Sequence, residues 1–153
     1  MFPVCLKVCY NYSSGRRKEV EMVMVTHAPL DPGKLFDEIQ KHGSGSVLFH
    51  YAVVKSKAGD AVSAGIRFER NGDIDAELEE ISSDVKGRWH IDDILLVRRI
   101  GTLKVGDVIS LVAVSASASA DAFEACRSGL DRMKRMVSLK KTELLQCQDK
   151  DLS

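Results

Sequence analysis

The sequence predicts an α+β fold in which helices pack on a largely antiparallel sheet. The runs 46–54 and 108–116 are apolar and of strand length, and a loop with glycines at 101 and 106 favours antiparallel pairing of 91–100 with the second run. Two further segments carry apolar residues at helical spacing after a capping residue. At 153 residues, with 44% hydrophobic and 29% charged side chains, the chain fits one domain with its own core.

The N-terminal segment predicts a β-hairpin. Residues 3–10 and 18–26 are rich in strand-forming side chains, and Ser13, Ser14 and Gly15 between them supply turn chemistry. Whether this hairpin extends the sheet, covers a site or binds a partner is left open by the sequence.

The first helix is expected to begin at Asp31, whose side chain can cap it, with Pro32 in the first helical position. The run Gly-Ser-Gly at 43–45 is expected to end it. Its apolar stripe consists of Leu35, Phe36 and Ile39.

One face of a strand over 62–68 is expected to be buried, because apolar residues occupy every second position. These residues are Val62, Ala64, Ile66 and Phe68. After a turn at Asn71 and Gly72, Asp73 is expected to cap a second helix that Gly87 ends. The core-facing positions of that helix are Ile74, Leu78, Ile81 and Val85.

The last helix is expected to begin near Ser119 or Asp121, after a run of small residues at 115–120. Its core-facing stripe consists of Phe123, Cys126, Leu130, Met133 and Val137. Small residues at such a junction leave the helix N-terminus open to a phosphate or carboxylate. The alternative is a tight packing corner with serine caps.

Charge balance argues against several classes of partner. Lys plus Arg and Asp plus Glu each number 22, so no overall field draws the chain to nucleic acid or to an acidic membrane. The longest uncharged, mostly apolar run, 46–54, is far shorter than the ~20 residues of a membrane span. No secretory signal pattern is visible at the N-terminus. We therefore expect a cytoplasmic protein without nucleic-acid or membrane partners.

A metal site is not expected. The cysteines form no Cys-x-x-Cys pair, the histidines are scattered, and reduced thiols are favoured in a cytosolic protein. Cys5 and Cys9 would point to the same face of a strand, and His50 on an apolar run favours a core or interface position. The residues concerned are Cys5, Cys9, Cys126, Cys147, His27, His42, His50 and His90.

Six cationic residues between positions 127 and 141 face a single acid, Asp131. Arg127, Lys134 and Lys141 are spaced by seven, so they form one ridge if the helix continues that far. The alternative is a solvated helix face on which Asp131 pairs with Arg135. The residues alone do not decide between these interpretations.

Several short motifs arrive in the order of one known family. They are T-H-A-P-L-D-P-G at 26–33, G-S-V at 45–47, the loop at Lys55, R-R-I-G at 98–101, V-G-D at 105–107 and A-F-E-A at 122–125. Over 20–143 the chain resembles the large, catalytic subunit of molybdopterin synthase, as a divergent member. The resemblance implies an α/β-hammerhead-like fold in a single domain, 1–153, with the hairpin segment 1–19 before it and a short tail, 144–153, after it.

The resemblance implies sulfur transfer in molybdenum cofactor biosynthesis. A small ubiquitin-like subunit brings a C-terminal Gly-Gly thiocarboxylate, whose sulfur is inserted into cyclic pyranopterin monophosphate to form the dithiolene. Lys134 and Lys141 correspond to the catalytic lysines of the family, and we assign Lys134 to the thiocarboxylate and Lys141 to the substrate. Ammonium groups suit these roles, because both reactants are anionic and must be held together.

Substrate-binding roles follow for Lys55, Arg99, Ser119, Arg127 and Lys140. Lys55 stands where the family has a substrate-binding arginine, which keeps the charge but loses the bidentate geometry. No cofactor is implied. The family assembles as a homodimer of large subunits with a small subunit at each outer end, and this assembly is expected here.

Two departures from the family pattern keep a second hypothesis open. Ala118-Ser119 replaces His-Arg, and Ser138-Leu139-Lys140-Lys141 replaces a motif of proline, an apolar residue, tryptophan and lysine. The first hypothesis is a working sulfurtransferase. The second is a family-fold protein that has lost catalysis and serves as a scaffold for a ubiquitin-like partner, and an unrelated cationic binding domain is the third.

Overall fold

The computed structural model describes residues 22–39 and 41–147, which form three helices and eight strands. In chain order these are β1 (Met22–Thr26), α1 (Pro32–Glu38), β2 (Ser46–Val53), β3 (Lys57–Ala58), β4 (Ala61–Arg70), α2 (Ile74–Arg88), β5 (Asp93–Arg99), β6 (Gly101–Leu103), β7 (Val108–Ala116), α3 (Ser119–Lys134) and β8 (Leu139–Leu145). The predicted strand at 3–10, with Cys5 and Cys9, lies outside the described residues.

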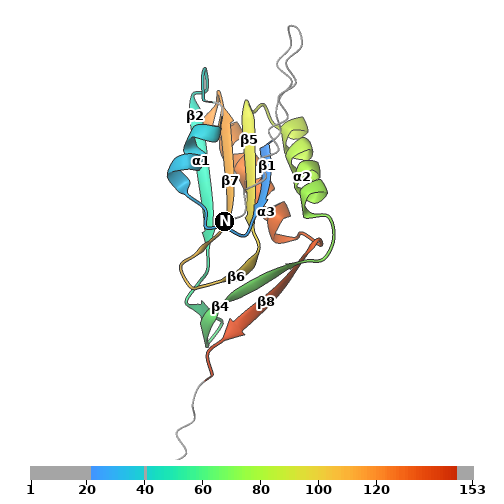
Figure 1. Ribbon diagram of the computed structural model, residues 1–153. Helices are drawn as coiled ribbons and strands as arrows, with labels where there is room; N and C mark the ends of the chain where they lie inside the picture. Colours follow the sequence, from blue (N-terminus) through green and yellow to red (C-terminus); the bar gives the residue numbers. More distant parts are fainter. Residues whose placement is uncertain (1–21, 40, 148–153) are drawn as a thin grey trace, which may run out of the picture.

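Two sheets organise the fold (Figure 1). The larger has the order β1-β5-β7-β2, in which β1 runs parallel to β5 and the other pairs are antiparallel. In the smaller, β4 pairs antiparallel with β3, β6 and β8. Figure 1 shows this smaller sheet lying across the lower end of the larger one. The predicted α+β class with largely antiparallel pairing is confirmed.

The central strands β5 and β7 are covered on both faces. Because side chains alternate along a strand, one face of β5 and β7 packs against α2 and α3, and the other packs against α1 (Figure 1). The first face consists of Ile94, Leu96, Val112 and Val114, and the second of Leu95, Val97, Leu111 and Ala113. The central residues of the two strands, 94–97 and 111–114, are therefore apolar and fully buried.

Helix α1 begins as predicted. The Asp31 carboxylate accepts hydrogen bonds from the amides of Gly33, at 3.0 Å, and Lys34, at 3.4 Å. The predicted end is wrong, because the helix stops at Glu38. Phe36 is also not in the core: its side chain is 47% exposed, since so short a helix turns only Leu35 towards the sheet, with Ile39 just after it.

The burial pattern of β4 differs from the predicted alternation. A bulge between Ser63 and Gly65 shifts the pairing with β8, so Val62 and Ala64 are exposed while Ser63, Gly65, Ile66 and Phe68 are buried. Gly65 has φ +137°, and a Cβ there would lie 2.1 Å from the carbonyl oxygen of Leu103. Only glycine fits at this close contact between the paired strands β4 and β6.

Helix α2 is confirmed, with the Asp73 cap and its four predicted apolar positions buried. Gly87 does not end it, because the last turn continues to Arg88. Helix α3 begins at Ser119, but two positions of its predicted stripe are wrong: Phe123 is 61% exposed, and Val137, past the helix end, is 78% exposed. Small residues face the core there instead, and Gly129 lets the helix lie close to β7, because a Cβ at this position would lie 3.3 Å from Val112 Cγ1.

The connection between β5 and β7 contains a strand that the sequence did not reveal. Gly101, with φ +101°, turns the chain into β6, which pairs with β4 and so joins the two sheets. Of the described cysteines, Cys126 is buried and Cys147 exposed, and both are free thiols.

Candidate functional site

The two predicted catalytic lysines stand on different elements. Lys134 is the last residue of α3, and Lys141 lies in β8. The predicted single ridge is therefore wrong, since the helix stops before Lys141. Residues 135–138 connect α3 to β8, and we call them the α3–β8 turn. Both lysine side chains are exposed.

Lys141 is paired across the strands with a residue of a cation–π contact, Phe68, whose cation is Arg98. It is the cross-strand partner of Phe68, so both side chains point to the same face of the small sheet. The guanidinium of Arg98 lies over the Phe68 ring, at 4.3 Å from its centroid. Burial lowers the pKa of Arg98 to about 10. The Lys141 ammonium itself contacts Glu143 Oε1, at 2.8 Å.

Asp107 contacts both Arg99 and the residue before Lys55. Arg99 Nη1 lies 3.4 Å from Asp107 Oδ2. The Asp107 carbonyl accepts a hydrogen bond from the amide of Val54, at 3.0 Å, and Val54 precedes Lys55. Arg99 is two residues before Gly101, which pairs with Phe68. These backbone pairings place positions 55, 99 and 141 near the junction of the two sheets.

The other predicted site residues lie elsewhere. Ser119 opens α3, so the helix rise places it about 22 Å from Lys134. Arg127 lies on the part of α3 that faces α2, and Lys140 pairs with Glu69 on the face of β8 opposite to Lys141. One copy of the chain does not gather all seven predicted residues.

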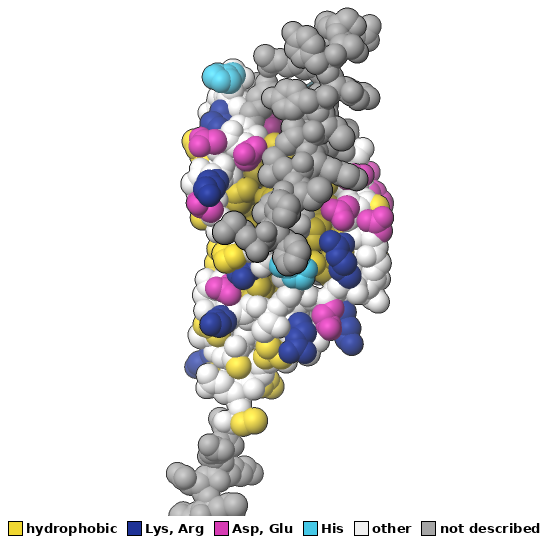
Figure 2. Space-filling view, viewed as in Figure 1, with side chains coloured by type: hydrophobic (Ala, Val, Ile, Leu, Met, Phe, Trp, Pro, Cys, Tyr) yellow, Lys and Arg dark blue, Asp and Glu magenta, His cyan; other side chains and the backbone are white. Residues whose placement is uncertain are grey.

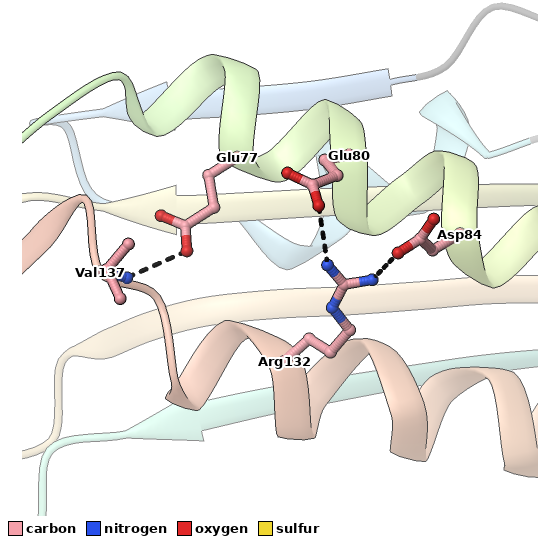
Figure 3. Close-up of polar contacts among 5 residues, drawn as sticks. All are labelled: Glu77, Glu80, Asp84, Arg132 and Val137. Atoms are coloured by element: carbon pink, nitrogen blue, oxygen red, sulfur yellow. Dashed lines mark hydrogen bonds and ion pairs between the residues drawn. The ribbon is translucent and has the colours of Figure 1, made fainter.

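A polar network that the sequence did not reveal holds the α3–β8 turn (Figure 3). Glu77 on α2 accepts hydrogen bonds from the amides of Val137, at 3.0 Å, and Ser138, at 2.9 Å. Asn71, which lies just before α2, donates its backbone N–H to the Ser138 carbonyl, at 2.7 Å, and its side-chain N–H to the Val137 carbonyl, at 3.3 Å. Glu77 and Asn71 together hold the backbone of the turn.

A second set of contacts joins α2 to α3. Arg132 pairs with Asp84 and, at 3.6 Å, with Glu80 (Figure 3). No ion pair joins Asp131 to Arg135, both of which the structure describes, so that predicted pair is absent. The acids at positions 77, 80 and 84 share one helix face by their spacing, which is the signal that sequence reasoning could have used.

The pKa of Glu77 is lowered. Burial acts to raise it, but hydrogen bonding by Ser138 and Val137 and the positive charge of Arg132 outweigh that effect. The carboxylate therefore stays ionised while it holds the turn.

Two hollows adjoin this network. One, of about 550 Å³ between α2 and α3, is lined by Glu77, Ile81, Arg88, Trp89, Glu124, Arg127, Ser128, Asp131, Arg132 and Arg135. The other, of about 350 Å³, is lined by Asn71, Gly72, Asp73, Ala76, Glu77, Glu80, Val137 and Ser138. Glu77 belongs to both.

Figure 2 shows the Lys and Arg side chains of one face interspersed with Asp and Glu side chains and not gathered in one patch. Among the residues that the structure describes, no three His, Cys, Asp or Glu side chains come together to hold a metal ion. The helices of that same part of the chain include none long and apolar enough to cross a membrane.

The family model described as "MoaE protein" matches residues 25–136 of this chain. The chain belongs to the MoaE family. The match includes Lys134 and ends before Lys141. The predicted family resemblance is confirmed, while the roles predicted for individual residues and the cytoplasmic location stay predictions.

Individual MoaE relatives agree. The molybdopterin synthase catalytic subunit of Caulobacter vibrioides is 27% identical over 124 residues, which cover 80% of this chain and 82% of the relative. The crystal structure of molybdopterin synthase from Staphylococcus aureus has a TM-score of 0.74 at 21% identity, covering 81% of this chain and 91% of that chain. The fold expected from the resemblance is confirmed.

A complex of two subunits is also similar in fold. The Helicobacter pylori structure described as a protein-protein complex of subunits 1 and 2 of molybdopterin-converting factor has a TM-score of 0.66 at 15% identity. It covers 86% of this chain and 92% of that chain. The MoaE fold therefore occurs in an assembly with a second subunit.

Proposed function

We propose that this MoaE-family chain is the catalytic, sulfurtransferase subunit of a molybdopterin synthase. It takes sulfur from the C-terminal Gly-Gly thiocarboxylate of a small ubiquitin-like subunit and inserts it into cyclic pyranopterin monophosphate. Family membership and relatives named molybdopterin synthase catalytic subunit support this reaction class.

One observation links the proposed reaction to specific residues. Both lysines that the resemblance marks as catalytic are present, one on each side of the short α3–β8 turn. Because polar contacts hold the backbone of that turn, α3 and β8 leave it in fixed directions. Two cations on adjoining elements suit a reaction that joins two anions.

Lys141 is assigned to the substrate. Its partner Glu143 is 38% exposed, and an ion pair exposed to this degree contributes little, about 0–1 kcal/mol. A substrate phosphate can therefore replace the Glu143 carboxylate at low cost. Lys134, which has no such partner in the described part of the chain, is assigned to the thiocarboxylate tail.

Lys55 and Arg99 are proposed to bind the substrate phosphate from the neighbouring sheet junction. Arg99 is already oriented by Asp107, and its Nε is buried and has no hydrogen-bond partner among the described residues. Such a donor favours an anionic ligand, because an unsatisfied buried N–H is costly. The roles of Arg127 and Lys140 remain predictions.

A homodimer is part of the proposal. Ser119 and Lys134 lie at opposite ends of α3, about 22 Å apart along the helix. If both belong to one active site, where the thiocarboxylate meets the substrate, they must come from two copies of the chain. The small subunit completes the assembly, as in the two-subunit complex of similar fold.

The test is reconstitution with a thiocarboxylated small subunit and the pterin precursor. Wild-type chain is expected to form the dithiolene product. Lys134→Ala and Lys141→Ala are expected to abolish it while binding of the small subunit persists. Lys34→Ala is the matched control, since Lys34 lies on α1, on the other face of the large sheet, and should retain wild-type turnover.

The second candidate function is a scaffold for the ubiquitin-like partner. Ala118 and Ser119 favour it, because they remove the cation that the family pattern places before the last helix. Binding of the small subunit by the wild-type chain without any dithiolene product would establish the scaffold and contradict the enzyme.

A further inference from the structure

Glu77 is the residue through which α2 reaches the α3–β8 turn. We propose that Glu77 is a positioning residue: its carboxylate fixes the turn and thereby sets the relative approach of Lys134 and Lys141. The catalytic part of this inference rests on the proposed function, and its structural part rests on the hydrogen bonds of Glu77.

The carboxylate binds both amides of the turn's second half. Its two oxygens accept one N–H each, from Val137 at 3.0 Å and Ser138 at 2.9 Å. Hydrogen bonds to an ionised acceptor are about twice as strong as neutral ones. Because the two N–H groups belong to successive peptide planes, 136–137 and 137–138, the two contacts restrain the orientation of both.

Packing alone does not hold this turn. Val137 is 78% exposed, so its side chain contributes little burial. Met133, near the end of α3, and Met136, in the first half of the turn, are buried and anchor the helix side. On the strand side, Leu139 is half-buried. The peptide between Val137 and Ser138 depends on its hydrogen bonds.

A second residue of the α2 region, Asn71, also holds the turn. Asn71 bonds both carbonyls of the same two residues, at 2.7 Å and 3.3 Å. Gly72 lies so close that a Cβ there would meet the Cα of Ser138 at 3.5 Å. All four backbone groups of Val137 and Ser138 are thus satisfied by side chains or backbone of the α2 region.

The identity of residue 138 decides whether such a clamp is available. A proline, which the family pattern has at this place, fixes φ by its ring and offers no N–H. Ser138 offers the N–H, and Glu77 accepts it. In this chain a carboxylate on a neighbouring helix supplies the restraint that a ring would supply locally.

The α2–α3 contact keeps the clamp in place. Arg132, in the last turn of α3, pairs with Glu80 and Asp84 on the face of α2 that also carries Glu77 (Figure 3). Sliding of α3 along α2 would break both sets of contacts. These contacts therefore fix the position of Lys134, at the end of α3, relative to Glu77. Glu77 in turn holds the turn that leads to Lys141.

The experiment compares Glu77→Gln and Glu77→Ala with Glu79→Gln in the full chain with its small subunit. Glu79 is exposed on the same helix and has no polar contact in the described part of the chain, so it is the matched control. The first measurement is amide hydrogen exchange at residues 137 and 138. It is expected to quicken at least tenfold in both Glu77 variants and to stay unchanged in the control.

The second measurement separates kcat from KM in dithiolene formation. Misplacement by about 1 Å can cost 100-fold in rate, so kcat is expected to fall about 10- to 100-fold in Glu77→Gln while small-subunit affinity changes less than about twofold. The melting temperature of each variant is measured alongside. A merely structural role would lower stability and leave the kcat of the folded protein unchanged.

Each outcome decides one claim. Unchanged exchange at 137 and 138 in Glu77→Gln overturns the clamp, whether or not the wild-type chain is active. Faster exchange with an unchanged kcat overturns the positioning role. An inactive wild-type chain contradicts the proposed function and with it the catalytic meaning of Glu77, while the exchange result still decides whether the clamp exists.

Discussion

The large sheet and the α3–β8 turn are held by different physics. In β5 and β7 the side chains on both faces are fully buried, and packing against helices stabilises them. At the turn the backbone is held by Glu77 and Asn71, with an exposed Val137 between them. The comparison shows that the residues that stabilise this fold and the residues of the candidate site lie in different regions of the molecule. Substitutions in the two regions should therefore have effects of different size and kind.

The largest effect is expected in the sheet core. Leu96→Ala removes a fully buried side chain next to Gly129, and the surrounding helices cannot close the cavity completely. The free energy of unfolding should fall by about 2–5 kcal/mol. Urea unfolding followed by circular dichroism measures it. A loss below about 1 kcal/mol would show that the core is looser than its burial indicates.

A somewhat smaller effect is expected where the two sheets join. Gly65→Ala places a Cβ against the Leu103 carbonyl and forces alanine into φ +137°. A loss of about 1–3 kcal/mol is expected from the backbone strain alone. Gly87→Ala is the control, because a Cβ there meets nothing within 4 Å, and inside α2 alanine should stabilise by about 1 kcal/mol. Equal effects of the two substitutions would contradict the close contact described here.

A pH-dependent effect is expected at the turn. Because the folded pKa of Glu77 lies below its ordinary value of 4.5, the folded state binds this proton less readily than the unfolded state. The contribution is therefore complete above about pH 4.5 and is lost as the pH falls through the folded pKa. Glu77→Gln should lower stability at neutral pH by about 0.5–1.5 kcal/mol.

The difference between wild type and Glu77→Gln should shrink in acid. Thermal unfolding of both proteins between about pH 3 and pH 7 measures it. Groups that share this environment are Arg132, Glu80 and the Ser138 hydroxyl, so Glu80→Gln serves as a control for the acid face of α2. A gap that stays constant down to the lowest pH would contradict the assigned role of ionisation.

The smallest effect is expected at the surface pairs of Arg132. Asp84→Asn removes one partly exposed ion pair and leaves Glu80 in place, so stability should fall by less than about 1 kcal/mol. Added salt should reduce the difference further, because exposed pairs are screened. A loss as large as that of Leu96→Ala would reverse the comparison between the two regions.

The sequence predicted the framework well, because framework signals are local. Asp31 and Asp73 are caps whose neighbours in the chain identify them, and the buried apolar run of β7 is visible in one segment. The β6 strand was missed, since three residues carry too little pattern. The bulge at Ser63 and Gly65 was missed because it depends on the pairing of β4 with β6 and β8, which are distant in the sequence.

The site was predictable only in part, for the same reason. The resemblance marked Lys134 and Lys141, but spacing by seven suggested one helix where a turn intervenes. Glu77 is separated from Val137 by 60 positions, and in the sequence it resembles any other acidic residue on the solvent-exposed face of a helix. Contacts over such distances appear only once α2 and α3 are packed side by side.

The length of α3 has a genetic consequence. In the homodimer proposed above, one protomer's Lys134 works beside the other protomer's Ser119, since a single helix keeps the two about 22 Å apart. Two alleles, each inactive because it lacks one of these residues, should then complement when expressed together, because mixed dimers contain one intact pair.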